Sequence, residues 1–176
     1  IDNGCAAGSS AVHLAVQSLK AGSADVALAI GCEKMNIADK LKALNMMEAG
    51  WDVARAEQNY QTLLKMGDGV EVPGGTESDK PFSKFMSIYA AMCRLHMKTF
   101  GTTQRQIAAV AAKNHAHSVH NPYSQFRKTF SIDEILAAPP ITYPLTLPMC
   151  APLSDGAAAV ILCTDQGLKR LRADRS

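Results

Sequence analysis

Cys5 is the residue of this 176-residue chain whose setting best suits covalent chemistry. It lies in a run of mostly small residues, Asn3 to Ser10, that leads into a predicted helix. Unpaired N–H groups and the positive end of the helix dipole favour the thiolate form of a cysteine at such a position. The small neighbours also leave room for a substrate carbonyl. The alternative is a buried, inert cysteine, and these residues alone leave both interpretations open.

A helix and a strand that follow Cys5 would hold it in place. Apolar residues recur at helical spacing up to a predicted stop at Ala21 and Gly22, namely Val12, Ala15, Val16 and Leu19. We expect this helix to be buried. The apolar run 26–30 is typical of a parallel strand covered on both faces. A second buried strand is predicted over 157–163, after a turn at 154–156. This order predicts the α/β fold class.

Local spacing places no acid or base beside Cys5. His13 lies eight residues further along the same helix, about 12 Å away at ~1.5 Å per residue, which is too far for proton transfer. His96 has no partner that the sequence identifies. His115, His117 and His120 cluster near the end of another predicted helix, where His117 and His120 share a face and could form a metal pair. An exposed helix end is the favoured interpretation, because no third ligand is apparent.

The charged residues near the two strands are interpreted as structural. Glu33 follows the first strand, and Lys34 beside it is a candidate charge partner. Asp155 precedes a glycine and fits a turn better than acid/base chemistry. The remaining cysteines lack the setting at a helix start and are predicted to be packing residues, namely Cys32, Cys93, Cys150 and Cys163.

The segment from Asn36 to about Gly101 differs in composition from the residues before it. It contains methionine-rich stretches with helical spacing, interrupted by glycine-containing turns at 67–69 and 72–75. Its methionines could line a flexible acyl pocket, although methionine at helical spacing more often fills a core. They are Met46, Met47, Met66, Met86, Met92 and Met97. Two predicted capping boxes, Thr103 with Gln106 and Ser131 with Glu134, begin two further helices.

Composition places the chain among globular proteins, with 47% hydrophobic and 19% charged residues. A net charge of +2 and a single short basic run, 169–172, predict no nucleic-acid partner. The five cysteines are odd in number and widely spaced, which favours a reducing compartment over a zinc site. No apolar run approaches the length of a membrane span.

Four motifs occur in the order found in thiolases. They are the Cys5 segment 3–10, Gly-Cys-Glu-Lys-Met at 31–35, the stretch 113–126 ending in Asn-Pro-Tyr-Ser-Gln-Phe, and Ser-Asp-Gly-Ala-Ala-Ala from 154. The third motif resembles the sterol-carrier-protein type of thiolase, whose members act on 3-oxoacyl-CoA thioesters. The resemblance covers nearly all of the chain, more loosely over 37–80. Two departures are Ala151, where many thiolases have a CoA-contacting serine, and Cys32, where some branches have glycine.

This resemblance implies a partial thiolase-like fold, layered α/β/α/β/α. Residues 1–36 and 104–176 would belong to the N-terminal core half, and 37–103 to an inserted loop domain that covers the CoA. The second half of the family, which supplies catalytic histidines and a second cysteine, has no counterpart in these residues. We therefore expect the chain to be a fragment of an enzyme.

The resemblance also implies a chemistry. Cys5 would take the acyl group of a 3-oxoacyl-CoA as a thioester, or act in the reverse Claisen condensation, and its own N–H would bind one oxyanion. Met86 would lie near the pantetheine arm of CoA, which is a substrate, with no cofactor bound permanently. Glu33 would belong to the packing around the helix that follows Cys5. We expect a homo-oligomer, a dimer or tetramer, in lipid or sterol side-chain metabolism such as fatty acid β-oxidation. Its compartment would be a bacterial cytoplasm or a peroxisome.

Two alternatives remain. The missing histidine half also fits a catalytically silent thiolase-like subunit that scaffolds a lipid-degrading complex. A ketosynthase-like condensing enzyme shares the placement of the nucleophile, but it fits the stretch 113–126 and the motif at 154 less well.

Overall fold

The computed structural model describes residues 1–46 and 51–173. It divides into two compact units, Ile1–Gly50 with Leu153–Ser176, and Trp51–Pro152. The boundaries expected for the core half and the insertion, at 36/37 and 103/104, differ from these limits and stay predictions about the family architecture. No helix among the described residues is both long enough and apolar enough to cross a membrane.

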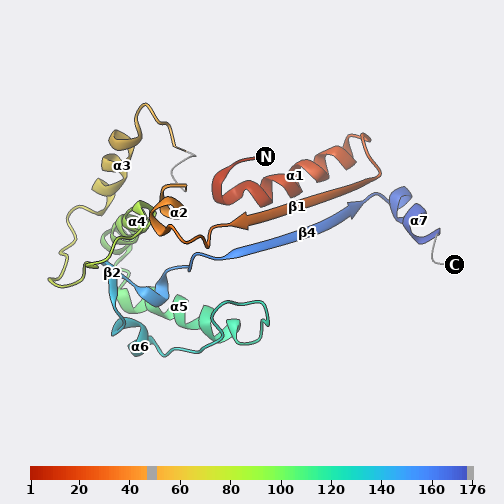
Figure 1. The fold of residues 1–176 in the computed structure, drawn as a ribbon. Helices are drawn as coiled ribbons and strands as arrows, with labels where there is room; N and C mark the ends of the chain where they lie inside the picture. The colour runs from red at the N-terminus through yellow and green to blue at the C-terminus, as the bar shows by residue number, and fades with distance from the viewer. Residues whose placement is uncertain (47–50, 174–176) are drawn as a thin grey trace. The chain divides into compact units, whose positions relative to one another are not determined.

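The first unit is built on one helix and two long strands. A 3₁₀ turn, η1 (Gly4–Ala6), leads into α1 (Ala7–Lys20), which packs against β1 (Val26–Lys34). β4 (Asp155–Cys163) pairs with β1, and α7 (Asp165–Ala173) follows it (Figure 1). The short helix α2 (Lys40–Met46) comes after β1. α1 ends where the spacing predicts, because Gly22 has a φ of +71°, which favours glycine.

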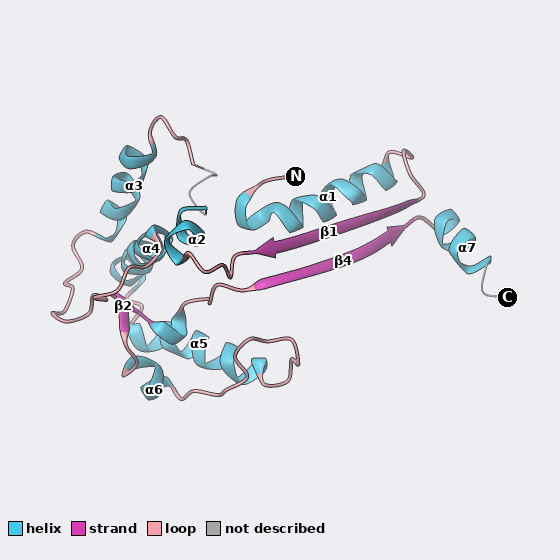
Figure 2. Ribbon diagram, viewed as in Figure 1, coloured by secondary structure: helices cyan, strands magenta, loops and turns pink. Residues whose placement is uncertain are grey.

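The two strands correct the expected direction of pairing. β1 and β4 are antiparallel, with an unbroken register from Val26 opposite Cys163 to Lys34 opposite Asp155 (Figure 2). An apolar run predicts a strand, but strand direction depends on where the intervening chain returns. Asp155 begins β4, so the turn expected at 154–156 is also wrong.

Burial in this unit differs from expectation too. Ala29 is the buried apolar residue of β1, whereas Leu28, Ile30 and Ile161 are more than half exposed. α1 was expected to be buried, but none of its residues is, and Leu14 is exposed. The physical reason is that α1 and the strand pair have little besides each other to pack against among the described residues of this unit.

The second unit is mainly helical. It contains α3 (Ala56–Leu64), η3 (Lys65–Gly67), α4 (Lys84–Phe100), α5 (Gln104–Ser118) and α6 (Ile132–Leu136). A small antiparallel pair, β2 (Pro140–Thr142) and β3 (Leu145–Thr146), precedes η4 (Leu147–Met149), and the Tyr143–Pro144 peptide between the strands is cis. The core consists of Ile88, Ala90, Ala91, Ala108, Ile135 and Leu145.

Local signals for the helices of this unit are confirmed. Both predicted capping boxes form: Thr103 with Gln106 at the start of α5, and Ser131 with Glu134 at the start of α6. In each, the hydroxyl accepts the N–H of the third helical residue, whose side chain in turn accepts the N–H of the cap. Gly101, with a φ of +70°, ends α4 before α5 begins.

Candidate active site

Cys5 lies at the centre of η1, directly before α1, and it is exposed. Two hydrogen bonds close the turn: the N–H of Ala6 donates to the Asn3 carbonyl at 3.1 Å, and the N–H of Ala7 donates to the Gly4 carbonyl. Gly4 has a φ of +52°, so the tight entry into the turn requires glycine. Both donors follow Cys5, and its own N–H is therefore not used to close the turn.

Side chains on both sides of Cys5 stabilise the same turn. Asn3 Nδ2 donates to Ser10 Oγ at 2.9 Å, which ties the residue two before Cys5 to the first turns of α1. The N–H of Gly4 donates to Asp2 Oδ1 at 3.3 Å. The sequence analysis does not predict the Asn3–Ser10 hydrogen bond. An amide and a hydroxyl seven residues apart, on either side of a helix start, are the pattern that could have indicated it.

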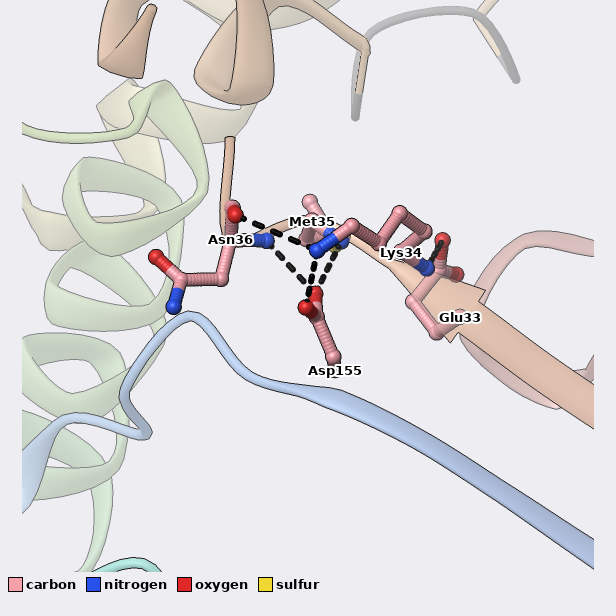
Figure 3. Close-up of polar contacts among 5 residues, drawn as sticks. All are labelled: Glu33, Lys34, Met35, Asn36 and Asp155. Carbon is pink, nitrogen blue, oxygen red and sulfur yellow. Dashed lines mark hydrogen bonds and ion pairs between the residues drawn. The ribbon is translucent and has the colours of Figure 1, made fainter. Parts of the chain in front are cut away.

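Asp155 binds the residues at the C-terminal end of β1 (Figure 3). Its Oδ1 accepts the N–H groups of Met35 and Asn36 at 2.9 and 2.8 Å, and its Oδ2 forms an ion pair with the Lys34 ammonium. The hydrogen bond from Lys34, followed by that from Asn36, holds the pKa of the Asp155 carboxyl below its usual value. We call these residues, Lys34, Met35, Asn36 and Asp155, the strand-end clamp.

The strand-end clamp corrects two expectations. Lys34 was predicted to pair with Glu33, but its partner is Asp155, since the antiparallel register places the two opposite each other. Glu33 instead accepts the N–H of Lys34 at 3.2 Å through Oε1, and it lies within β1. α1 and β1 run in opposite directions, joined by the turn at 21–25, so η1 and the strand-end clamp lie at the same end of the first unit (Figure 2).

The other candidate residues do not join Cys5. His13 lines a shallow depression on α1 with Ser9, Ser10 and Leu14. Met86 is half-buried in the first turn of α4, in the second unit, and its contact with CoA stays a prediction. None of the described methionines is fully buried, and Met47 lies outside the described residues.

Of the three histidines near the end of α5, His115 has structural partners. Nε2 of His115 lies 3.0 Å from the Pro148 carbonyl, and its ring packs edge-on against Phe130 at 4.8 Å. His96 hydrogen-bonds to Thr102 at 2.8 Å. Across the part of the chain that the structure describes, no group of three or more His, Cys, Asp and Glu could hold a metal ion.

The cysteines predicted to pack fall into two groups. Burial raises the pKa of Cys93 and of Cys150, both half-buried, and Cys163 is also half-buried. Cys32 is exposed on β1, so its assignment as a packing residue is wrong for this chain. Cys5 and Cys32 are therefore the two exposed thiols, and of these only Cys5 lies at a helix start.

An α/β unit with an exposed cysteine in the turn before a strand-packed helix is the kind of domain that can present a nucleophile. Residues 1–135 match the thiolase N-terminal domain, and the chain belongs to the thiolase family. It has a partial thiolase-like α/β fold.

Three curated relatives illustrate the match. Benzoylsuccinyl-CoA thiolase subunit BbsB of Thauera aromatica is 32% identical over 171 residues, which is 97% of this chain and 38% of the relative. Sterol carrier protein 2 of Bos taurus is 34% identical over 172 residues, 94% of this chain and 28% of the relative. Acetyl-CoA acetyltransferase of Methanothermobacter thermautotrophicus is 31% identical over 164 residues, 93% of this chain and 36% of the relative. The chain thus spans between 28% and 38% of the length of these relatives.

A solved structure of an Ltp2-ChsH2(DUF35) aldolase has the same fold. The TM-score is 0.63 at 20% identity, over 94% of this chain and 37% of that chain. At this level of identity, the likeness concerns the fold.

Proposed function

We propose that the protein is an acyl-CoA acyltransferase of the thiolase type and that Cys5 is its nucleophile. The observation that carries this proposal is the exposed Cys5 in a turn closed by Ala6 and Ala7, at the start of a helix, in a chain of the thiolase family. Relatives named as thiolases or as an acetyltransferase support the reaction class.

The proposed reaction has two steps. The Cys5 thiolate attacks the 3-oxo carbonyl carbon of a 3-oxoacyl-CoA, the bond between C2 and C3 breaks, and the electron pair leaves on C2 of acetyl-CoA. A general acid protonates that carbon. The sulfur of a second CoA then attacks the acyl thioester on Cys5, which releases a shortened acyl-CoA and regenerates the thiol.

One feature of the turn around Cys5 supports this reaction. The N–H of Cys5, free of the hydrogen bonds that close η1, can donate to the developing oxyanion. The Cys5 side chain has no hydrogen bond or ion pair to a described residue, and we assign the proton transfer to no residue of this chain.

The wider context belongs to the same proposal. CoA is a substrate, no cofactor is bound permanently, and Met86 contacts the pantetheine arm. The protein works as a homo-oligomer, a dimer or tetramer, in lipid or sterol side-chain metabolism, in a bacterial cytoplasm or a peroxisome. Relatives named sterol carrier protein 2 support the assignment to lipids.

The test is covalent trapping of the acyl group. The whole protein is incubated with acetyl-CoA or a 3-oxoacyl-CoA, and its intact mass and peptide map are measured. One acyl group on Cys5, absent from Cys5→Ser and retained in Cys32→Ser, is the expected result. Cys32→Ser is the matched control because Cys32 is the other exposed thiol. An unmodified Cys5 during turnover would refute the assignment.

A second candidate is a catalytically silent thiolase-like subunit that scaffolds a partner. It is favoured by the name of one relative, which is called a thiolase subunit, and by the Cys5 side chain having no hydrogen bond or ion pair with a described residue. If Cys5 takes no acyl group and the whole protein has no turnover, but activity requires a second purified subunit, this candidate replaces the first.

A further inference from the structure

The loop between α5 and α6, residues 119–130, exposes two aromatic side chains. Tyr123 is 94% exposed and Phe126 is 52% exposed. The loop leaves the end of α5 and returns toward α6 within the second unit (Figure 1). Single exposed apolar residues are ordinary, so the exposure alone indicates nothing. The hydrogen bonds within the loop and the positive charge around it are the features that indicate a binding site.

The loop is held by its own hydrogen bonds. Asn121 Oδ1 accepts the N–H of Tyr123 at 3.0 Å, and the Asn121 carbonyl accepts the N–H of Ser124 at 3.1 Å. Ser118 Oγ, at the end of α5, donates to the Phe126 carbonyl at 2.7 Å. Both aromatic residues are therefore presented on a fixed backbone, and a partner that contacts them would not have to order the loop first.

The stretch from 113 to 130 is cationic. It contains Lys113, Arg127 and Lys128, and no Asp or Glu. Arg127 and Lys128 are exposed, with the Lys128 ammonium 4.8 Å from the centre of the Phe130 ring. The nearest carboxylates in the sequence follow after this stretch.

Those carboxylates belong to α6. Glu134 accepts the N–H of Ser131 at 2.7 Å, and Asp133 forms an ion pair with Arg105. Residues 119–130 therefore contain no carboxylate of their own to offset Arg127 and Lys128, and among the α6 carboxylates Glu134 interacts with the charge of Lys128.

We propose that residues 119–130 form a docking site for a partner protein with an acidic surface. Tyr123 inserts into an apolar pocket of the partner, and Arg127 and Lys128 contact its carboxylates. Tyrosine and arginine are the residue types that dominate the energetics of protein interfaces. A lipid surface fits less well, since the polar residues Ser124 and Gln125 separate the two aromatic residues and no continuous apolar face is formed. The site uses no residue of η1 or of the strand-end clamp, so it does not depend on the proposed reaction.

The experiment uses the whole protein with a photo-crosslinking phenylalanine in place of Tyr123, illuminated in extract of its own source. The matched control carries the same group in place of Tyr89, which is 48% exposed on α4 of the same unit. We expect one discrete protein adduct at 123 and none at 89. The adduct is identified, and its purified protein is titrated against the whole protein.

Three results are expected in that titration. Tyr123→Ala weakens binding by about tenfold or more, the size of effect typical of a hot-spot tyrosine. The double variant R127E/K128E weakens it further and reduces its salt dependence. Tyr89→Ala and Lys169→Glu leave it unchanged, and all variants keep the unfolding temperature of the parent.

Several outcomes would overturn the proposal. They are the absence of an adduct at 123, an adduct only with a second copy of the chain, or a partner whose affinity is unmoved by R127E/K128E. Tyr123-dependent binding to phosphatidylcholine vesicles containing phosphatidylserine, in place of a protein, would also overturn it and assign the loop to a membrane.

Discussion

Gly167 offers a sharp test of how α7 docks beside the strand pair. The residue is buried near the start of α7, and a Cβ atom at this position would lie 2.1 Å from the Asp25 carbonyl oxygen and 2.9 Å from its carbon. The same carbonyl accepts the N–H of Thr164 at 3.0 Å, and the Asp25 carboxylate pairs with Arg170 at 2.6 Å. Gly167→Ala therefore forces α7 away from the Asp25 carbonyl oxygen, which already accepts the N–H of Thr164.

Two effects of Gly167→Ala oppose each other. Alanine is favoured over glycine in a helix interior by about 1 kcal/mol. Overpacking against rigid atoms typically costs about 1–3 kcal/mol, and a lengthened hydrogen bond from Thr164 costs about 1 kcal/mol more. The steric cost exceeds the gain in helix propensity, because the nearest obstructing atoms belong to the Asp25 backbone and cannot rotate away. We expect a loss of about 2 kcal/mol in the free energy of unfolding, which corresponds to roughly 4–8 °C for a cooperative unit of about 150–250 residues.

The assay is thermal and urea unfolding of the parent and variants, followed by circular dichroism. Gln166→Ala is the matched control, because it is exposed on the same helix and changes no contact with Asp25; we expect it to stay within about 0.5 kcal/mol of the parent. A Gly167→Ala variant as stable as the parent, or more stable, would show that helix propensity prevails and that α7 does not approach Asp25 as described.

Three further predictions concern local groups. The hydrogen bond from the N–H of Ser131 lowers the pKa of Glu134. The stability that Glu134 contributes is therefore present above the pKa of an unfolded glutamate and is lost as the pH falls through the folded pKa. Acid unfolding of Glu134→Gln should lack this pH-dependent loss, and an acid unfolding profile identical to that of the parent would contradict the prediction. Burial raises the pKa of Cys93 and Cys150, so iodoacetamide at neutral pH should modify the exposed Cys5 and Cys32 first. The two half-buried thiols should gain reactivity only at higher pH than an ordinary cysteine, which peptide mapping would measure. Loss of the hydrogen bond in Asn3→Ala should slow acylation of Cys5 about fivefold, for a bond worth ~1 kcal/mol, with Ser10→Ala and the double variant giving the same loss; additive losses would mean that the two side chains act separately.

Part of the candidate site could be predicted from residues close together in the chain. The placement of Cys5 at a helix start depends on Gly4, on the small residues after it and on the apolar spacing that begins α1. The capping boxes of α5 and α6 likewise involve residues three apart. Hydrogen bonds of this kind close within one helical turn, so the residues that make them are adjacent in sequence, and the family motifs rest on the same short stretches.

The contacts between residues far apart in the sequence depend on the tertiary structure. Lys34 pairs with Asp155, 121 residues later, and not with its neighbour Glu33, because the antiparallel register of β1 and β4 places the two opposite each other. The apolar runs of both strands predicted the strands themselves, but neither their direction nor their exposure. Apolar composition measures a tendency to leave water, whereas pairing direction and burial depend on which surfaces the rest of the chain brings to the strands.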